Sequence, residues 1–267
     1  RGPEASPHKP QRGRLAVVSG GLAATGAASL AAHAGLRTGA GLVTLLCPPS
    51  ALIVVASSVT AVMTSSSASA EDLVAQTERS SAIVIGPAAG VTDATRANVE
   101  ALARAGRSLV LDADALTVFA GQSDQLRAVL SAPAILTPHT GEFERLFPGL
   151  LAKSVNRIDA VCAASSEVNA VVLLKGADTV IAAPDGRAVV NTHATPFLAT
   201  AGAGDVLAGI IGSLLAQGLP AFDAACAGAW MQGDAGLRVG AGLTAEDLDK
   251  ALRSVIRDLH ANRHGPT

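Results

Sequence analysis

The architecture is indicated most clearly by Leu15-Ala16-Val17-Val18-Ser19-Gly20-Gly21 and by the two segments that follow it, Gly26–Thr38 and Leu42–Leu46. Leu15–Ser19 and Leu42–Leu46 are short apolar runs without alternation of apolar and polar residues. Strands with this pattern are buried on both faces, as in a parallel sheet covered by helices on both sides. Gly20-Gly21 marks a turn, and the intervening segment has the length of a crossover helix. The stretch therefore predicts a strand–helix–strand unit.

The same alternation continues along the chain. Further strands are expected at Ile83–Ile85, Leu109–Leu111, Ala134–Leu136, Val171–Leu174 and Val180–Ala182. Further helices are expected at Thr92–Ala105, Asp124–Leu130, Gly141–Phe147, Val155–Ser165, Gly204–Gln217, Ala221–Val239 and Ala245–Leu259. Ser65–Ser69, rich in serine and alanine, is expected to be a loop. Such alternation predicts a mostly parallel central sheet between two helical layers, the three-layer α/β/α class.

The 267 residues fit one large α/β domain, which we expect to span residues 13–260. Residues 1–12 are rich in proline and polar residues and lack the apolar segment of a signal peptide. They are interpreted as a linker or an excised boundary. Residues 261–267 are interpreted as a tail.

Composition argues against several classes of protein. The net charge is −2 and the basic residues are scattered, so no nucleic-acid partner is expected. No apolar run approaches the roughly 20 residues that span a bilayer, so no membrane association is expected. Cys47, Cys162 and Cys226 lie far apart without C-x-x-C spacing. Three such cysteines are typical of buried thiols in a cytoplasmic protein rather than of a disulfide framework or a zinc site.

Glycines and ionisable residues gather directly after five of the expected strands. They are Gly20-Gly21, Gly86–Gly90, Asp112 with Asp114, His139 with Glu142, and Lys175-Gly176. The carboxyl ends of parallel strands meet at one edge of the sheet, where ligands bind. Only 16% of the residues are charged, so this clustering predicts a functional edge.

The segment Ala199-Thr200-Ala201-Gly202-Ala203-Gly204-Asp205-Val206-Leu207-Ala208-Gly209 carries the chemistry. Its small residues allow a tight turn with exposed backbone amides, and the following helix adds free N–H groups and its positive dipole end. Together these groups suit a phosphoryl group. Asp205 in the first turn is placed to accept a proton from an attacking hydroxyl. The alternative is an ordinary helix start capped by Asp205. The spacing is neither a Walker A loop nor a Rossmann fingerprint.

Gly202-Ala203-Gly204-Asp205 resembles the G-x-G-D anion hole of the ribokinase-like superfamily. Further segments, in matching order and spacing over nearly the whole chain, resemble the ADP/ATP-dependent NAD(P)H-hydrate dehydratases, the carbohydrate-kinase-like YjeF C-terminal domain. These segments are His8-Lys9, Gly26–Val43, Leu111–Leu116, Leu136–Phe143, Leu174–Ile181 and Gly204–Ile211.

The resemblance implies a ribokinase-like fold and an enzyme, a hydro-lyase of nicotinamide nucleotide repair. Such enzymes restore NADH and NADPH from the S epimers of their hydrates, NADHX and NADPHX. They use ADP or ATP, with Mg²⁺, to phosphorylate the 6-hydroxyl group before it is eliminated. The resemblance also implies a homo-oligomer, and an NAD(P)HX epimerase as the N-terminal half of the same parent chain.

The resemblance further implies roles for individual residues. Asp205 is expected to be the catalytic base. Glu142 is expected to hold Mg²⁺ through a phosphate or a water, or alternatively to be a first-turn glutamate favoured by the helix dipole. For His139 the alternative to substrate binding is a histidine that satisfies backbone groups at a strand end. The expected substrate-binding residues are Ala27, Ala88, His139 and Asp205. The expected nucleotide-binding residues are Lys175, Gly176, Ala177, Asp178, Thr179, Gly202, Ala203 and Gly204.

Two segments depart from the family pattern. Gly86-Pro87-Ala88-Ala89-Gly90 stands where the family often has G-P-G-L-G, and Ala88 restricts the positive φ that glycine permits. Ala201 and Ala203 replace the common glycine and threonine of G-G-T-G-D, which removes a hydroxyl group but leaves the backbone amides.

Two other functions stay open from the sequence. One is a small-molecule kinase of the same superfamily, such as a hydroxymethylpyrimidine or hydroxyethylthiazole kinase. The other is a non-catalytic nucleotide-binding module, against which the presence of Asp205 argues.

Overall fold

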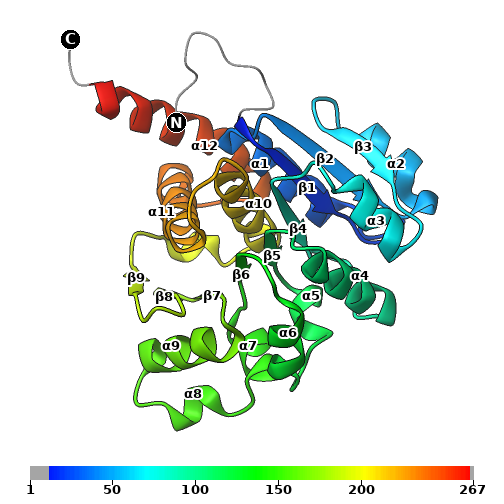
Figure 1. Ribbon diagram of the computed structural model, residues 1–267. Coiled ribbons are helices and arrows are strands. Elements are labelled where there is room, and N and C mark those ends of the chain that lie inside the picture. Colours follow the sequence, from blue (N-terminus) through cyan, green and yellow to red (C-terminus); the bar gives the residue numbers. More distant parts are fainter. Residues whose placement is uncertain (1–11, 265–267) are drawn as a thin grey trace.

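The computed structural model describes residues 12–264. Within them, nine strands form one sheet in the order β3-β2-β1-β4-β5-β6-β7-β8-β9 (Figure 1). Neighbours from β3 to β7 are parallel, whereas β8 and β9 are antiparallel additions at one edge. The strands are β1 (Arg14–Val18), β2 (Leu42–Cys47), β3 (Met63–Ser66), β4 (Ala82–Ile85), β5 (Leu109–Leu111), β6 (Ala134–Leu136), β7 (Val171–Leu174), β8 (Thr179–Ala182) and β9 (Ala188–Asn191).

The central strands are buried on both faces, as their apolar runs predict. In β1, Leu15 and Val17 pack into the core on one face, while Ala16 and Val18 pack into the core on the other. Val17 is paired with Leu45 of β2 and also with Val84 of β4. A strand with neighbours on both sides and cores on both faces has no solvated surface, which explains its lack of polar residues.

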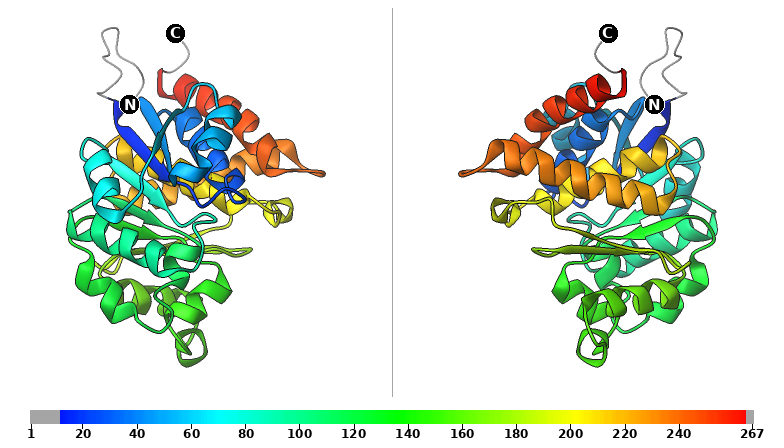
Figure 2. Two further views of the ribbon diagram at one scale, coloured as in Figure 1. Left: turned by 90° about the vertical axis from the view of Figure 1, so that its right-hand side faces the viewer. Right: turned by 90° about the vertical axis from the view of Figure 1, so that its left-hand side faces the viewer.

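Helices cover both faces of the sheet (Figure 2). One face carries α1 (Gly26–Thr38), α2 (Leu52–Ser58), α10 (Ala203–Ala216) and α11 (Ala221–Val239). The other carries α3 (Ala70–Gln76), α4 (Asp93–Arg104), α5 (Asp114–Thr117), α6 (Ser123–Val129), α7 (Thr140–Leu146) and α9 (Arg157–Val168), with α8 (Leu150–Lys153) beside α9. α12 (Ala245–His264) lies outside α1, α10 and α11, and two short 3₁₀ helices are η2 (Pro49–Ala51) and η3 (Pro196–Leu198). The expected three-layer α/β/α fold is confirmed.

Small residues let α10 pack closely against α1 and β4. A Cβ atom on Gly209 would lie 2.1 Å from the carbonyl oxygen of Ala31 in α1. A Cβ atom on Gly212 would lie 2.5 Å from Cγ2 of Val84 in β4. Both separations are shorter than van der Waals contact, so only glycine fits. This packing fixes α10, and therefore its first turn, relative to the sheet.

The sequence prediction is wrong at the edges of the sheet. Ser65 and Ser66 belong to β3 rather than to the expected loop, since Ser65 pairs with Leu46 of β2. β9 was not expected, and like β3 it is an edge strand with few buried side chains. Strands of this kind lack the apolar run on which the prediction depends. The short helices α2, α3, α5 and α8 were not expected either.

The C-terminal helix is longer than predicted. α12 continues to His264, five residues beyond its expected end at Leu259. Residues 1–11 and 265–267, which include the expected linker and the His8-Lys9 segment, lie outside the described residues. Among the described helices, none is long and apolar enough to cross a membrane.

Candidate active site

The carboxyl edge of the sheet has its topological switch point between β1 and β4. From β1 the chain moves outward to β2 and β3, and then returns to the opposite side of β1 as β4. Connections leaving β1 and β4 therefore diverge, and ligands of open α/β sheets bind in the resulting crevice. α10 packs on β1, β4 and β5 and begins at this edge.

The turn before α10 is held in a conformation that requires glycine. Gly202, the N-cap residue, has φ +84°, and a Cβ atom there would lie 2.7 Å from Cδ1 of Leu30 and 2.8 Å from Cβ of Ala245. The amide of Ala203 bonds the carbonyl oxygen of Thr200, which closes the turn. The first-turn amides of a helix have no intrahelical partner and stand at the positive end of its dipole. The geometry is that of an anion-binding helix start.

A buried ion pair stands over this first turn. Lys175 Nζ lies 2.7 Å from Asp112 Oδ1 and 3.8 Å from Glu142 Oε2. A Cβ atom on Gly204 would lie only 3.4 Å from the same ammonium group. Burial lowers the pKa of Lys175, but the attraction of Asp112 and Glu142 outweighs it and raises the pKa above its usual value. The lysine is therefore a permanent positive charge beside the anion-binding amides.

Asp205 has the electrostatic surroundings of a general base. Burial and the repulsion of Asp112 raise its pKa to about 6, while Lys175 opposes the shift. A carboxylate with this pKa is ionised at neutral pH and is a stronger proton acceptor than an ordinary aspartate. The N-cap residue of α10 is Gly202 rather than Asp205, which lies in the first turn of the helix.

His139 and Glu142 form the start of α7 at the same edge. His139 Nδ1 accepts hydrogen bonds from the amides of Gly141 at 2.9 Å and Glu142 at 3.3 Å, and Glu142 Oε2 accepts from the amide of His139 at 2.8 Å. This reciprocal pair is a capping box. Because Nδ1 accepts, the proton of the neutral ring is on Nε2. Both structural alternatives raised from the sequence therefore describe real contacts, and the histidine ring is still exposed to the cavity.

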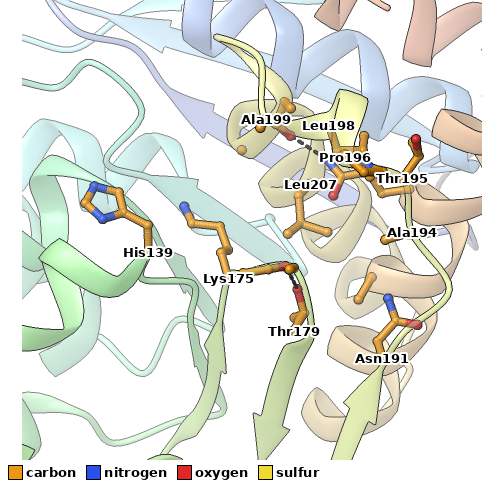
Figure 3. A pocket seen from close by; sticks show the side chains of 16 residues that line it. His139, Lys175, Thr179, Asn191, Ala194, Thr195, Pro196, Leu198, Ala199 and Leu207 are labelled. Carbon is orange, nitrogen blue, oxygen red and sulfur yellow. Dashed lines mark hydrogen bonds between the residues drawn. The ribbon is translucent and has the colours of Figure 1, made fainter. Parts of the chain in front are cut away.

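A cavity of about 530 Å³ opens beside the first turn of α10 (Figure 3). Figure 3 shows His139 and Lys175 on one side of it and the segment Ala194–Ala199 on the other. The cavity brings together seven of the predicted site residues, namely His139, Lys175, Gly176, Ala177, Thr179, Ala203 and Gly204. Asp178 and Gly202 belong to the same two loops but do not line it, and Asp205 lies one residue beyond Gly204.

A comparison with protein families places the chain in one of them. The profile of the NAD(P)H-hydrate dehydratase family matches residues 15–257. The chain belongs to the NAD(P)H-hydrate dehydratases.

Individual relatives of this dehydratase family agree with the assignment. The ADP-dependent (S)-NAD(P)H-hydrate dehydratase of Neisseria meningitidis is 37% identical, with 92% of this chain and 86% of that protein covered. The bifunctional NAD(P)H-hydrate repair enzymes of Thermosynechococcus vestitus and Moorella thermoacetica are each 40% identical, with 86% and 96% of this chain covered. The chain spans about half the length of these bifunctional relatives, 46% and 51%.

Solved structures agree as well. The ADP/ATP-dependent NAD(P)H-hydrate dehydratase of Bacillus subtilis, co-crystallised with ATP and Mg²⁺, superimposes with a TM-score of 0.83 at 27% identity, covering 96% of this chain and 93% of that one. A hydroxyethylthiazole kinase from Pyrococcus horikoshii shares the fold alone, with a TM-score of 0.64 at 17% identity.

The two remaining residues expected from the dehydratase family lie outside the cavity. Ala27 is in the first turn of α1, and Ala88 follows β4. Their loops meet, because a Cβ atom on Gly20 would lie 1.8 Å from the carbonyl oxygen of Ala88. Ala88 has φ +51°, the left-handed conformation in which the family often has glycine. The alanine therefore adopts this conformation at the cost of backbone strain.

Asp114 supports this second loop of the dehydratase. Its Oδ2 accepts a hydrogen bond from the amide of Gly90 at 2.8 Å. Asp112 and Asp114, which follow the same strand, thus have separate partners. Asp112 binds Lys175, and Asp114 binds the loop after β4. Arg37, at the end of α1, forms an ion pair with Asp249 of α12.

The contribution of α11 to the cavity was not predicted from the sequence. Ala229 and Gln232 line the cavity from α11, as Leu207 does from α10. The loop after β9 lies on α11, where a Cβ atom on Gly233 would meet the carbonyl oxygen of His193 at 1.7 Å. The glycines of α11 were a signal of close packing, but nothing in the sequence said which segment approaches them.

Proposed function

We propose that this chain catalyses the dehydration of NADHX and NADPHX, the S epimers of hydrated NADH and NADPH, at the expense of ADP or ATP. The observation that carries the proposal is the carboxylate of Asp205, with its pKa raised to about 6, in the first turn of a helix whose amides and neighbouring Lys175 can receive a phosphoryl group. The name of the Neisseria meningitidis relative, which covers most of both chains, supports the same reaction.

The chemistry follows from the poor leaving ability of hydroxide. Asp205 accepts the proton of the 6-hydroxyl group. The hydroxyl oxygen bonds to the terminal phosphorus of the nucleotide, and the bond between that phosphorus and the bridging oxygen breaks. The amides around Gly204 and the ammonium of Lys175 stabilise the charge on the phosphoryl oxygens. Phosphate is then a good leaving group, so the C–O bond breaks with electrons supplied by the ring nitrogen. A proton lost from the ring completes the net loss of water.

The residues of the cavity fit a nucleotide. Lys175–Thr179, between β7 and β8, supplies backbone groups and one cation, and the opposite wall is largely apolar, as a nucleobase requires. Ala27, Ala88 and His139 are proposed to contact the hydrated dinucleotide.

A magnesium ion would depend on the nucleotide for most of its ligands. No three acidic, histidine or cysteine side chains in residues 12–264 converge as a metal site. Glu142, which already accepts a backbone hydrogen bond, is proposed as its one protein contact, through a phosphate or a water. Mg²⁺ would neutralise phosphate charge, which it typically does with few protein ligands and several waters.

An assay with both nucleotides tests the proposal. NADHX is incubated with the protein and ADP or ATP, and the return of the NADH absorbance band is followed. We expect recovery only with nucleotide, and none with Asp205→Asn. A panel of small alcohols, including hydroxyethylthiazole, serves as the control for kinase activity. Phosphorylation of one of these alcohols without NADHX turnover would establish the alternative function.

The partner of this activity is proposed from the length of the relatives. We propose that the parent protein also carries an NAD(P)HX epimerase domain, which the bifunctional relatives make plausible because this chain spans about half of them. Sequencing the parent reading frame tests it. The homo-oligomer expected from the sequence stays a prediction, for which sedimentation velocity is the measurement.

A further inference from the structure

Gln232 is a buried polar side chain with a single described partner at the candidate active site. It lies on α11, is 8% exposed, and lines the cavity. Its Nε2 donates a hydrogen bond to the carbonyl oxygen of Ala203, in the first turn of α10. A buried amide of this kind is costly unless its hydrogen bonds are made, so its location requires a reason.

The partner of Gln232 is the peptide group that supplies the anion-binding amide. The carbonyl of Ala203 and the N–H of Gly204 belong to one planar peptide unit. Fixing the carbonyl therefore fixes the direction of that N–H. A hydrogen bond to the carbonyl also polarises the peptide and makes its N–H a stronger donor.

This peptide unit has a cation near one end and a hydrogen-bond donor at the other. Lys175 Nζ stands over Gly204, where an added Cβ atom would lie 3.4 Å from it. Gln232 holds the other end of the same peptide from α11. The helix itself is immobilised by the close packing of Gly209 on α1.

We infer that Gln232 is a positioning residue that orients and polarises the Ala203–Gly204 peptide, so that the Gly204 amide stabilises the transferring phosphoryl group. The expected change in reaction rate rests on the proposed function. The orientation and polarisation of the Ala203–Gly204 peptide do not depend on that function.

The chain offers a matched control at the opposite end of α10. Gln217 is a partly buried glutamine whose Nε2 donates to the carbonyl oxygens of Thr38 at 3.3 Å and Ser213 at 3.1 Å. It is as much a helix-anchoring side chain as Gln232, but it is remote from the site. Gln232→Met and Gln217→Met therefore remove the same kind of donor while keeping the length of the side chain.

The first measurement is the amide spectrum of the ligand-free protein labelled with ¹⁵N. We expect Gln232→Met to move the Gly204 resonance upfield and Gln217→Met to leave it in place. An unmoved Gly204 resonance in a folded Gln232→Met protein overturns the inference, whatever reaction the protein catalyses.

The second measurement separates transition-state from ground-state effects. With NADHX and ADP as substrates, Gln232→Met is expected to lower kcat about tenfold, with little change in the Kd of ADP. Gln232→Glu, which places a carboxylate against the carbonyl, is expected to lower kcat further. If Gln232→Met weakens ADP binding with kcat unchanged, Gln232 is a simple nucleotide contact and the inference is wrong. Absence of activity in the wild-type protein would instead contradict the proposed function.

Discussion

Asp112 binds Lys175 through a 2.7 Å contact, and the two residues act on Asp205 in opposite directions. After burial, the repulsion of Asp112 is the largest cause that raises the Asp205 pKa, and Lys175 lowers it. The pair thus holds the base between a negative and a positive neighbour, which keeps its pKa below neutral pH yet above that of an exposed aspartate.

The pH dependence of the reaction follows from this arrangement. A base must be deprotonated, so kcat/KM is expected to rise with pH through about 6 and then level off. Asp112→Asn removes a negative neighbour, which favours the carboxylate form of Asp205, so the rise of kcat/KM should move to lower pH. Lys175→Met should move it to higher pH, because a favourable charge is lost. Rate profiles of the three proteins between pH 4 and pH 9 (roughly the range in which carboxylates titrate) provide the measurement, and shifts in the reverse directions would contradict the assignment.

Asp205→Asn separates proton transfer from nucleotide binding. The amide keeps the shape of the side chain but cannot accept the proton, so kcat should fall by about 10²–10⁴. Calorimetric titration with ADP should give a nearly unchanged Kd, since the backbone amides of the loop remain. Asp249→Asn, in the ion pair with Arg37 remote from the site, is the control and should retain activity. Retained turnover in Asp205→Asn would falsify its role as the base.

Gly202→Ala should unfold the anion-binding turn. The new Cβ atom would be 2.7 Å from Leu30 and 2.8 Å from Ala245, in addition to a φ of +84° that side chains disfavour. Strain and overlap together are expected to lower the free energy of unfolding by about 3 kcal/mol.

The control for this change is Gly218→Ala. Gly218 has φ +89° but no atom within 4 Å of the added Cβ, so only the backbone cost of about 1 kcal/mol applies. Urea unfolding of both variants gives the comparison. Equal losses would show that packing around Gly202 contributes nothing.

Ala88→Gly should make the protein more stable. Ala88 has φ +51°, a strain of about 1–2 kcal/mol that glycine relieves, and this gain exceeds the cost of about 0.4–1 kcal/mol that a glycine adds through the entropy of the unfolded chain. Ala105→Gly is the control, because Ala105 has φ −75° and glycine there should lower stability through the entropy of the unfolded chain. Thermal melts that rise for Ala105→Gly or fall for Ala88→Gly would contradict this account.

The parallel core of the fold was predictable because each central strand is an uninterrupted apolar run. Ile83–Ile85 and Leu109–Leu111 are buried on both faces, and a short apolar run followed by glycine or acidic residues is typical of such a strand. β3 (Met63–Ser66) and β9 (Ala188–Asn191) were not predicted. Edge strands are stabilised by pairing on one side, and their exposed side chains need not be apolar. Edge pairing is a property of the sheet and leaves little trace in composition.

The location of a residue at the candidate site was predictable where it depends on local position in the sequence. Asp205 and Lys175 are in this class, since each follows directly on a turn or a strand end. Gln232 is not, because nothing in its helix indicates that it reaches the carbonyl of Ala203, 29 residues earlier in the chain. Contacts of this kind are set by the packing of one helix on another, which the sequence does not specify locally.

The contact between Gly202 and Ala245 joins the turn before α10 to α12. Ala245 begins α12, the last helix described, and Asp249 of the same helix binds Arg37 at the end of α1. The turn before α10 therefore has its outer support only when α12 is docked. A variant truncated before Ala245 is expected to keep the sheet but to lose the packing that holds this turn.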